Sequence, residues 1–174
     1  MPIGTPVIKV TRTKFYGADI VLTGNNYDEA SAACKAAVLE RKGTLVHPFD
    51  DKLVIAGQGT IGLEIMAQAP DIDIIIAPVG GGGMISGLAL AAKEINPNIK
   101  IIGVEPAKIP SMAKRLHGDM SIHAPVSTIA DGINVSVLNH MILLNIRTVY
   151  HMFSIEFIGS TSWFFNCRDV QDIS

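Results

Sequence analysis

The chain has 174 residues and a formal net charge of −2, and 48% of its residues are hydrophobic against 17% that are charged. This balance predicts a folded core and excludes a disordered protein, and without a basic excess we expect neither a nucleic acid nor a membrane surface as partner. The most apolar stretch, residues 141–158, is interrupted by Arg147 and Glu156 and lacks the run of about 18 apolar residues that a membrane helix needs.

The first quarter of the chain predicts one helix between two short strands. An apolar run at Asp19–Leu22 indicates a strand, and small or apolar side chains at spacings of three and four predict a helix over Tyr27–Lys42. We expect Cys34 to lie on the buried face of this helix and Gly43 to cap its end. A second short strand is predicted at Thr44–Val46.

From residue 53 onward, apolar runs alternate with helical patterns. The pattern predicts a helix over 53–69 broken near Gly57 and Gly59, a strand over 72–79, a glycine loop, a helix over 84–95 and a strand over 99–104. The strand over 72–79 is almost continuously apolar, which is typical of a parallel strand covered on both faces. This order predicts an α/β fold, a parallel sheet with helices on both faces.

Four consecutive glycines, Gly80–Gly83, follow the predicted strand and open the next helix. Glycine backbone can close around an anion, and the first amides of a helix are unpaired donors with a partial positive charge. We therefore predict a phosphate site here, against the alternative of a flexible turn or a close contact between strand and helix. A P-loop is excluded because Met84 and Ile85 stand where lysine and serine or threonine would be needed.

A dinucleotide-binding loop is the second candidate. Its fingerprint needs glycines at positions i, i+2 and i+5, and no glycine in Gly80–Gly83 begins that spacing. Only Glu105 favours this alternative, since a ribose-binding acid can stand at the end of the next strand.

The motifs around the loop resemble the fold-type-II pyridoxal-phosphate enzymes, and among them the serine/threonine dehydratases, also called threonine ammonia-lyases. The resemblance covers about residues 1–135, and its most specific part pairs an Ala-Gly-Gln-Gly-Thr run with the four glycines. The matching segments are His47–Asp51, Val54–Ile65, Pro78–Gly87, Ile102–Pro106 and Thr128–Gly132.

The resemblance implies a tryptophan-synthase-β-like fold with pyridoxal 5′-phosphate as cofactor. It implies that the cofactor phosphate is held by Gly80, Gly81, Gly82 and Gly83, with the amide of Met84 as a weaker candidate. It also implies an amino-acid substrate, elimination of water to a 2-oxo acid and ammonia, and a homo-oligomer. Which hydroxyamino acid is used stays open.

The resemblance also identifies what the chain lacks. In the family, the lysine that carries the cofactor lies in a Ser-Phe-Lys-x-Arg-Gly motif upstream, followed by an asparagine loop around the pyridine ring. None of the nine lysines has that context, so no catalytic residue is assigned. We expect an inactive fragment, and a non-catalytic α/β module that binds a phosphate-bearing ligand is the alternative.

Two further predictions concern residues outside the loop. In serine racemases, relatives of this family, a glutamate after the corresponding strand and an aspartate six residues later bind a divalent ion. Here Glu105 matches but Ser111 replaces the aspartate, so we expect no metal. His47 is interpreted as a residue at the domain crossover and not as a base.

The resemblance divides the chain into a remnant of a small domain (1–46), part of a large cofactor-binding domain (47–135) and an atypical tail (136–174). The tail shows no helical or strand period, and suitable codons for residues 135–146, read from the third base, encode a run typical of the family. We interpret it as the product of a frameshift near Ser136 that packs poorly. Two cysteines in no disulfide or metal spacing and no signal-peptide pattern predict a cytoplasmic protein.

Overall fold

The structure is a computed structural model that describes residues 1–116, 118–119, 121, 130–135, 151–157 and 163–165. The chain divides into two compact units, Met1–Val46 and His47–Ser174. The boundary falls where the motifs separate the two predicted domains. That these units correspond to parts of a small and a large domain stays a prediction.

The first unit contains two helices, α1 (Val7–Phe15) and α2 (Tyr27–Arg41). The Asn26 side chain caps α2 by accepting a hydrogen bond from the amide of Glu29 at 2.9 Å. The carboxylate of Glu29 accepts in return from the amide of Asn25 at 2.8 Å. The predicted glycine cap is displaced by one residue, because Lys42 ends the helix in the left-handed conformation at φ 50°.

None of the residues 1–46 is buried, which contradicts the prediction that Cys34 belongs to a core. Large apolar side chains such as Phe15 and Leu39 are more than 80% exposed. Neither short strand predicted in this unit forms. Met1–Ile3 runs beside 21–24 with only three backbone bonds, and an apolar run becomes a strand only where a partner strand continues the ladder.

The second unit is built on a four-stranded sheet in the order β1 (Ile74–Pro78), β2 (Lys100–Pro106), β3 (His151–Phe157) and β4 (Trp163–Phe165). Strands β1, β2 and β3 are parallel, and β4 is antiparallel to β3. The tail thus supplies regular strands that its sequence pattern did not predict. The frameshift interpretation stays a prediction, and residues 136–150, 158–162 and 166–174 lie outside the described residues.

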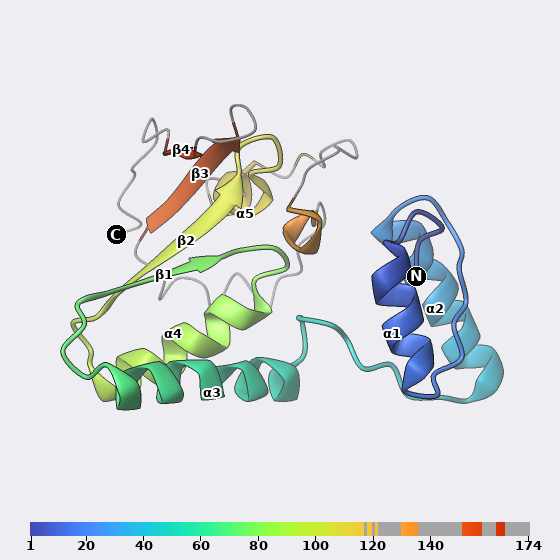
Figure 1. Ribbon diagram of the computed structural model, residues 1–174, viewed down its shortest axis with the longest axis horizontal. Helices are drawn as coiled ribbons and strands as arrows, with labels where there is room; N and C mark the ends of the chain where they lie inside the picture. The colour runs from blue at the N-terminus through green and yellow to red at the C-terminus, as the bar shows by residue number, and fades with distance from the viewer. Residues whose placement is uncertain (117, 120, 122–129, 136–150, 158–162, 166–174) are drawn as a thin grey trace. The chain divides into compact units, whose positions relative to one another are not determined.

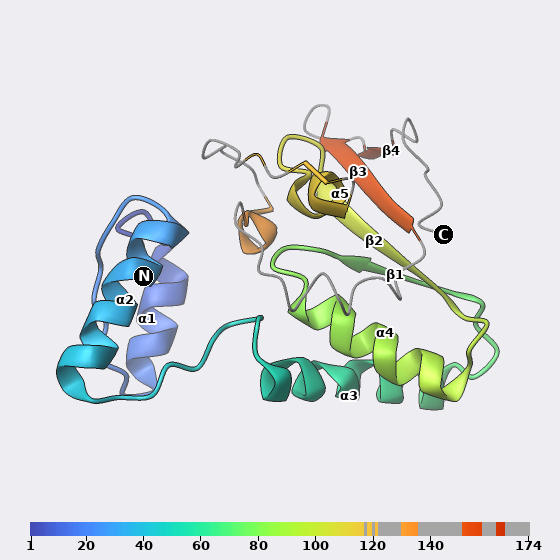
Figure 2. The ribbon, with the colours of Figure 1, turned by 180° about the vertical axis from the view of Figure 1, so that it is seen from behind.

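The helices α3 (Lys52–Gln68), α4 (Gly83–Ile95) and α5 (Ser111–Leu116) contribute to one core on one face of β1 and β2. Figures 1 and 2 show α3 and α4 together on the same side of these strands. Ile75 and Ile101 are buried on this face, whereas Ile74 and Ile76 are 48% and 62% exposed on the other. Within the described residues, α3, α4 and α5 thus pack on this one face of β1 and β2.

Helix α3 is continuous, although the sequence predicted a break at its glycines. The glycines let α3 lie close against α4: a methyl group on Gly62 would lie 2.6 Å from the carbonyl oxygen of Leu88. On α4, a methyl group on Gly87 would overlap the carbonyl oxygen of Ile55. Packing between the helices thus offsets the low helix propensity of glycine.

We expect Gly62→Ala to lower the free energy of unfolding by about 1–3 kcal/mol, because the added methyl group meets backbone that cannot rotate away. Gly57→Ala is the matched control, since its methyl group would contact nothing within 4 Å and alanine favours the helix by about 1 kcal/mol. In urea denaturation, the midpoint of Gly62→Ala should be lower than that of the unmodified chain, and the midpoint of Gly57→Ala should be higher. Equal midpoints would contradict the close packing of α3 and α4.

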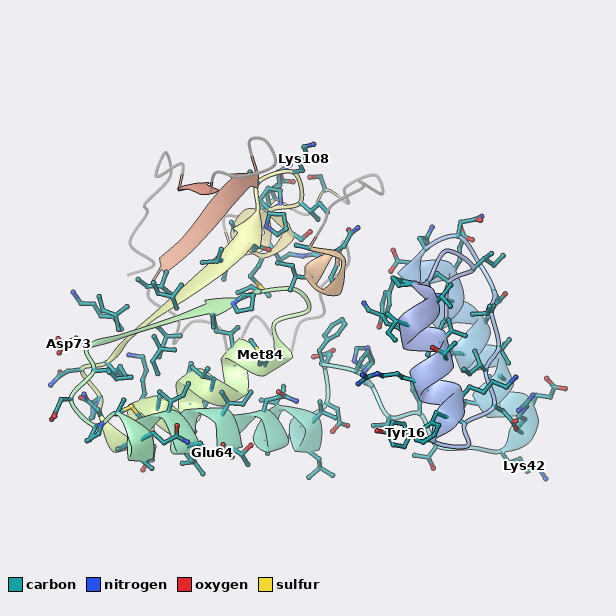
Figure 3. All side chains as sticks on the ribbon, in the orientation of Figure 1. Tyr16, Lys42, Glu64, Asp73, Met84 and Lys108 are labelled. Atoms are coloured by element: carbon teal, nitrogen blue, oxygen red, sulfur yellow. The ribbon has the colours of Figure 1, made fainter. Side chains whose placement is uncertain are left out.

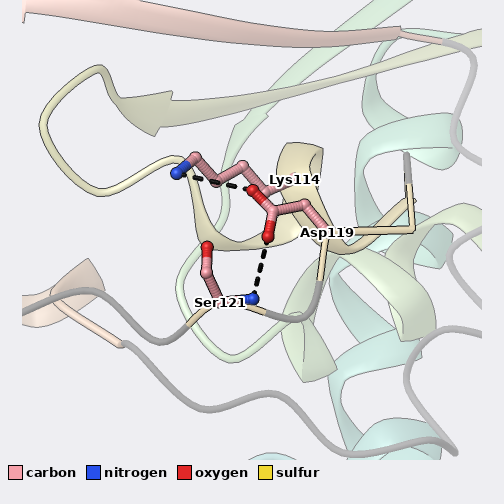
Figure 4. A network of polar contacts seen from close by, with 3 residues as sticks. All are labelled: Lys114, Asp119 and Ser121. Atoms are coloured by element: carbon pink, nitrogen blue, oxygen red, sulfur yellow. Dashed lines mark hydrogen bonds and ion pairs between the residues drawn. The ribbon is translucent and has the colours of Figure 1, made fainter.

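Polar contacts of Asp119 hold the segment after α5. After α5, the carboxylate of Asp119 accepts a hydrogen bond from the amide of Ser121 at 2.9 Å and lies 3.6 Å from the Lys114 ammonium (Figure 4). This backbone hydrogen bond is the main reason that the pKa of Asp119 lies below its usual range.

No helix within the described ranges is long and apolar enough to span a bilayer.

Candidate functional site

The glycine loop lies between the carboxyl end of β1 and the first turn of α4, as its sequence position predicted. Gly82 stands at the helix N-cap with φ 87°, a conformation that favours glycine. Met84 follows in the first turn of α4 (Figure 3). The loop therefore combines a strand end, a left-handed residue and a helix N-terminus.

The loop amides are donors without acceptors in the described part of the chain. The first helical hydrogen bond runs from Ser86 to the carbonyl oxygen of Gly82, and no hydrogen bond is donated by the amides of Gly80–Ile85 to a described residue. Gly81–Gly83 are buried, while Gly80 and Met84 are partly exposed. Buried N–H groups require a partner, so this loop fits an anion such as a phosphate.

A buried hydroxyl lies close to these amides in the chain. Ser86, one turn into α4, is 0% exposed, and its Oγ has no hydrogen-bond partner among the described residues. The sequence pattern does not distinguish Ser86, because a serine in the first turn of a helix is common. Only its complete burial without a partner marks it as a polar group at the site.

The loop glycines also have a packing role that the sequence did not reveal. A side chain on Gly81 would overlap the ring of Phe49, and one on Gly83 would overlap the Phe49 backbone. A side chain on Gly80 would lie 3.0 Å from the Cα of Ile133. These contacts are with the Phe49 turn and with Ile133, not between strand and helix, and they coexist with the open amides.

Phe49 belongs to a turn that begins at His47. The Nδ1 atom of His47 accepts a hydrogen bond from the amide of Asp50 at 2.8 Å and a longer one from the amide of Phe49 at 3.4 Å. The two rings meet edge to face with 4.7 Å between their centroids. Directly after the turn, Asp51 caps α3 by accepting from the amides of Leu53 and Val54.

Glu105 does not have the role that the sequence suggested. It is 2% exposed, and its two carboxylate oxygens accept hydrogen bonds from the amides of Met112 at 2.7 Å and Ala113 at 2.9 Å. Burial raises the pKa of Glu105 to about 7, although these two hydrogen bonds act in the opposite direction. Both carboxylate oxygens of Glu105 are thus used to cap the first turn of α5.

The described residues contain no group of three or more His, Cys, Asp or Glu side chains that could hold a metal ion. Ser111, which replaces the aspartate of a metal site, is buried, and its Oγ lacks a partner within the same residues. The Glu105 carboxylate accepts hydrogen bonds from α5, and Ser111 supplies no carboxylate. The expectation of no metal stays a prediction.

Comparison with known proteins supports the assignment from the motifs. The chain is 52% identical over 136 residues to an L-threonine ammonia-lyase of Geobacter sulfurreducens and 46% identical over 138 residues to the catabolic L-threonine dehydratase of Escherichia coli. Both alignments cover 78% of this chain, but only 34% and 42% of the relatives. The chain thus spans less than half the length of these curated relatives.

A solved structure shows the same fold. The processed form of threonine deaminase isoform 2 from Solanum lycopersicum matches with a TM-score of 0.79 and 41% identity, over 87% of this chain and 45% of that one. This likeness confirms the α/β fold of the tryptophan-synthase-β type. Residues 1–155 also match the family described as pyridoxal-phosphate dependent enzyme, and the chain therefore belongs to the pyridoxal-phosphate-dependent enzymes.

Proposed function

We propose that this chain is the phosphate-anchoring part of a threonine or serine dehydratase. The observation that carries the proposal is the set of buried loop amides in Gly80–Gly83 without a described acceptor. The similarity to L-threonine ammonia-lyases supports the choice of pyridoxal 5′-phosphate as the ligand. An anion would reach the loop from the side of Gly80 and Met84, which keep some exposure.

The cofactor, when bound, supplies the electron sink for elimination of water from a hydroxyamino acid. The part played by this chain is anchoring. Its loop amides donate hydrogen bonds to the phosphate oxygens, and the dipole of α4 adds favourable electrostatics at its N-terminus. Met84 extends this row of donors by one amide in the first helical turn.

Proton transfer at the substrate requires a positioned base, and the chain lacks the motif that supplies the family's lysine. Lys52, Lys93 and Lys108 are examples of lysines whose sequence context differs from that motif. We therefore propose anchoring without turnover for the chain alone. The alternative, a module that holds another phosphate-bearing ligand, uses the same loop and differs only in ligand preference.

Two ligands without an aldehyde test the anchoring role, because lysine amines react with aldehydes non-specifically. Pyridoxine 5′-phosphate should bind at least about a hundredfold more tightly than pyridoxine, since two or more charge-assisted hydrogen bonds of about 1.5 kcal/mol each are at stake. Isothermal titration calorimetry measures both affinities. Equal affinities would refute phosphate anchoring by the loop.

The same protein with added pyridoxal phosphate should release 2-oxo acid from threonine no faster than the cofactor alone. A faster rate that is lost when one lysine is replaced would show that the chain is catalytic. A stronger preference for another organic phosphate would favour the alternative of a general phosphate-binding module.

A further inference from the structure

We infer that His47 is a positioning residue that holds the Phe49 ring on Gly81 and so fixes the shape of the glycine loop. The inference rests on the proposed phosphate-binding role of that loop. It assigns to His47 a role in the site that the sequence did not suggest, since its place before a proline indicated only a crossover between domains.

The first step is the turn itself. Nδ1 of His47 accepts from the amides two and three residues ahead, which is the arrangement that asparagine and aspartate side chains use to build turns. To accept these bonds, Nδ1 must be unprotonated, so the ring proton of the neutral imidazole is on Nε2. Pro48, between His47 and Phe49, has no amide hydrogen and restricts the backbone further.

The second step is the contact between the turn and the loop. The position that a side chain on Gly81 would take is filled by the Phe49 ring, so a Cα hydrogen of Gly81 points at that ring. The backbone of Phe49 closes over Gly83 in the same manner, with the Phe49 Cα 2.9 Å from a side-chain position on Gly83. Phe49 therefore contacts the loop at two points, and both depend on the turn that His47 maintains.

The third step is the consequence for binding. Loop amides bind an anion well only when they are already oriented, because ordering them during binding costs conformational entropy. Phe49 restricts Gly81 and Gly83, the residues with the greatest backbone freedom, before a ligand arrives. Without the His47 acceptor, the turn should lose its hydrogen bonds. The Phe49 ring should then leave Gly81, and the glycine loop should become more mobile.

Three variants distinguish the acceptor role of His47 from the role of its imidazole ring and from that of the Phe49 ring. His47→Ala removes both, whereas His47→Asn removes the ring but retains an acceptor that can close the same turn. Phe49→Leu keeps the turn and removes the aromatic ring from Gly81. Thermal unfolding of each variant without ligand shows whether its fold is retained.

The ligand-independent measurement is the NMR chemical shift of the Gly81 Cα hydrogens, which the Phe49 ring should move upfield. We expect the upfield shift in the unmodified chain and in His47→Asn, and its loss in His47→Ala and Phe49→Leu. An upfield shift that persists in His47→Ala, or that is lost in His47→Asn as well, would overturn the inference.

Affinity for pyridoxine 5′-phosphate is the functional measurement. His47→Ala should bind about tenfold more weakly, the effect of roughly one hydrogen bond, and His47→Asn should stay near the affinity of the unmodified chain. Equal affinity of His47→Ala and the unmodified chain would overturn the link from turn to site. Failure of the unmodified chain to bind would refute the proposed function, while the NMR comparison would still decide whether His47 positions Phe49.

Discussion

Replacement of Gly81 by valine is expected to weaken binding of pyridoxine 5′-phosphate by at least about a hundredfold. Two charge-assisted hydrogen bonds of about 1.5 kcal/mol each account for a loss of that size. The added side chain would occupy the place of the Phe49 ring, so the loop or the ring must move, and the loop amides lose their common orientation. The expected loss of affinity thus has two causes: the new side chain displaces the Phe49 ring, and it blocks the approach of the ligand.

Calorimetric titration of the folded variant is the measurement, and Gly57→Val is the matched control. Gly57 is exposed on α3, and a methyl group there would contact nothing within 4 Å. The double variant Gly81→Ala with Phe49→Ala should bind better than Gly81→Ala alone, because removing the ring relieves the overlap. Unchanged affinity in Gly81→Val would contradict the role of the loop.

The second large effect concerns pH and the buried carboxyl of Glu105. Its pKa of about 7 in the folded chain lies above the ordinary value of 4.5, so the folded state retains a proton that the unfolded chain releases. The contribution to stability is therefore fully present below pH 4.5 and is lost as the pH rises through 7. Over these 2.5 units the free energy of unfolding should fall by about 3 kcal/mol.

Glu105→Gln removes this titration but cannot accept both hydrogen bonds, because an amide nitrogen donates. The variant should be less stable at pH 5 by about 1–3 kcal/mol, and the difference from the unmodified chain should shrink or reverse by pH 8. Subtracting the two pH profiles cancels the other titrating groups, which both proteins share. Glu64→Gln, at an exposed glutamate on α3 (Figure 3), is the control for loss of a carboxylate. A difference that is constant with pH would refute the elevated pKa.

Much of the second unit could be predicted from local patterns. The alternation of apolar runs and helical periods located α3, β1, α4 and β2 to within a few residues. The glycine loop was placed correctly between a strand and a helix, and the motifs around it identified the family that the comparisons confirmed. These features depend on neighbours in the chain, and local periodicity and glycine conformation are encoded there.

Other predictions failed where partners distant in sequence decide the outcome. Asp19–Leu22 has strand composition but no continuous partner ladder, and Cys34 has a helical apolar spacing but no core to enter. The glycines of α3 suggested a break, yet contact with α4 makes them compatible with a continuous helix. Helix α1 and strand β3 were missed because neither has a clear period in the sequence.

The sequence by itself determined the family, the parallel α/β order and the glycine loop at Gly80–Gly83 as the candidate phosphate site. Only the tertiary structure decided that Phe49 lies on Gly81, that Glu105 caps α5, and that the face of β1 carrying Ile74 is exposed within the described residues. The physical reason is that hydrogen-bond acceptance, burial and steric overlap depend on distances between atoms of residues far apart in the chain, and periodicity along one segment contains no such distance.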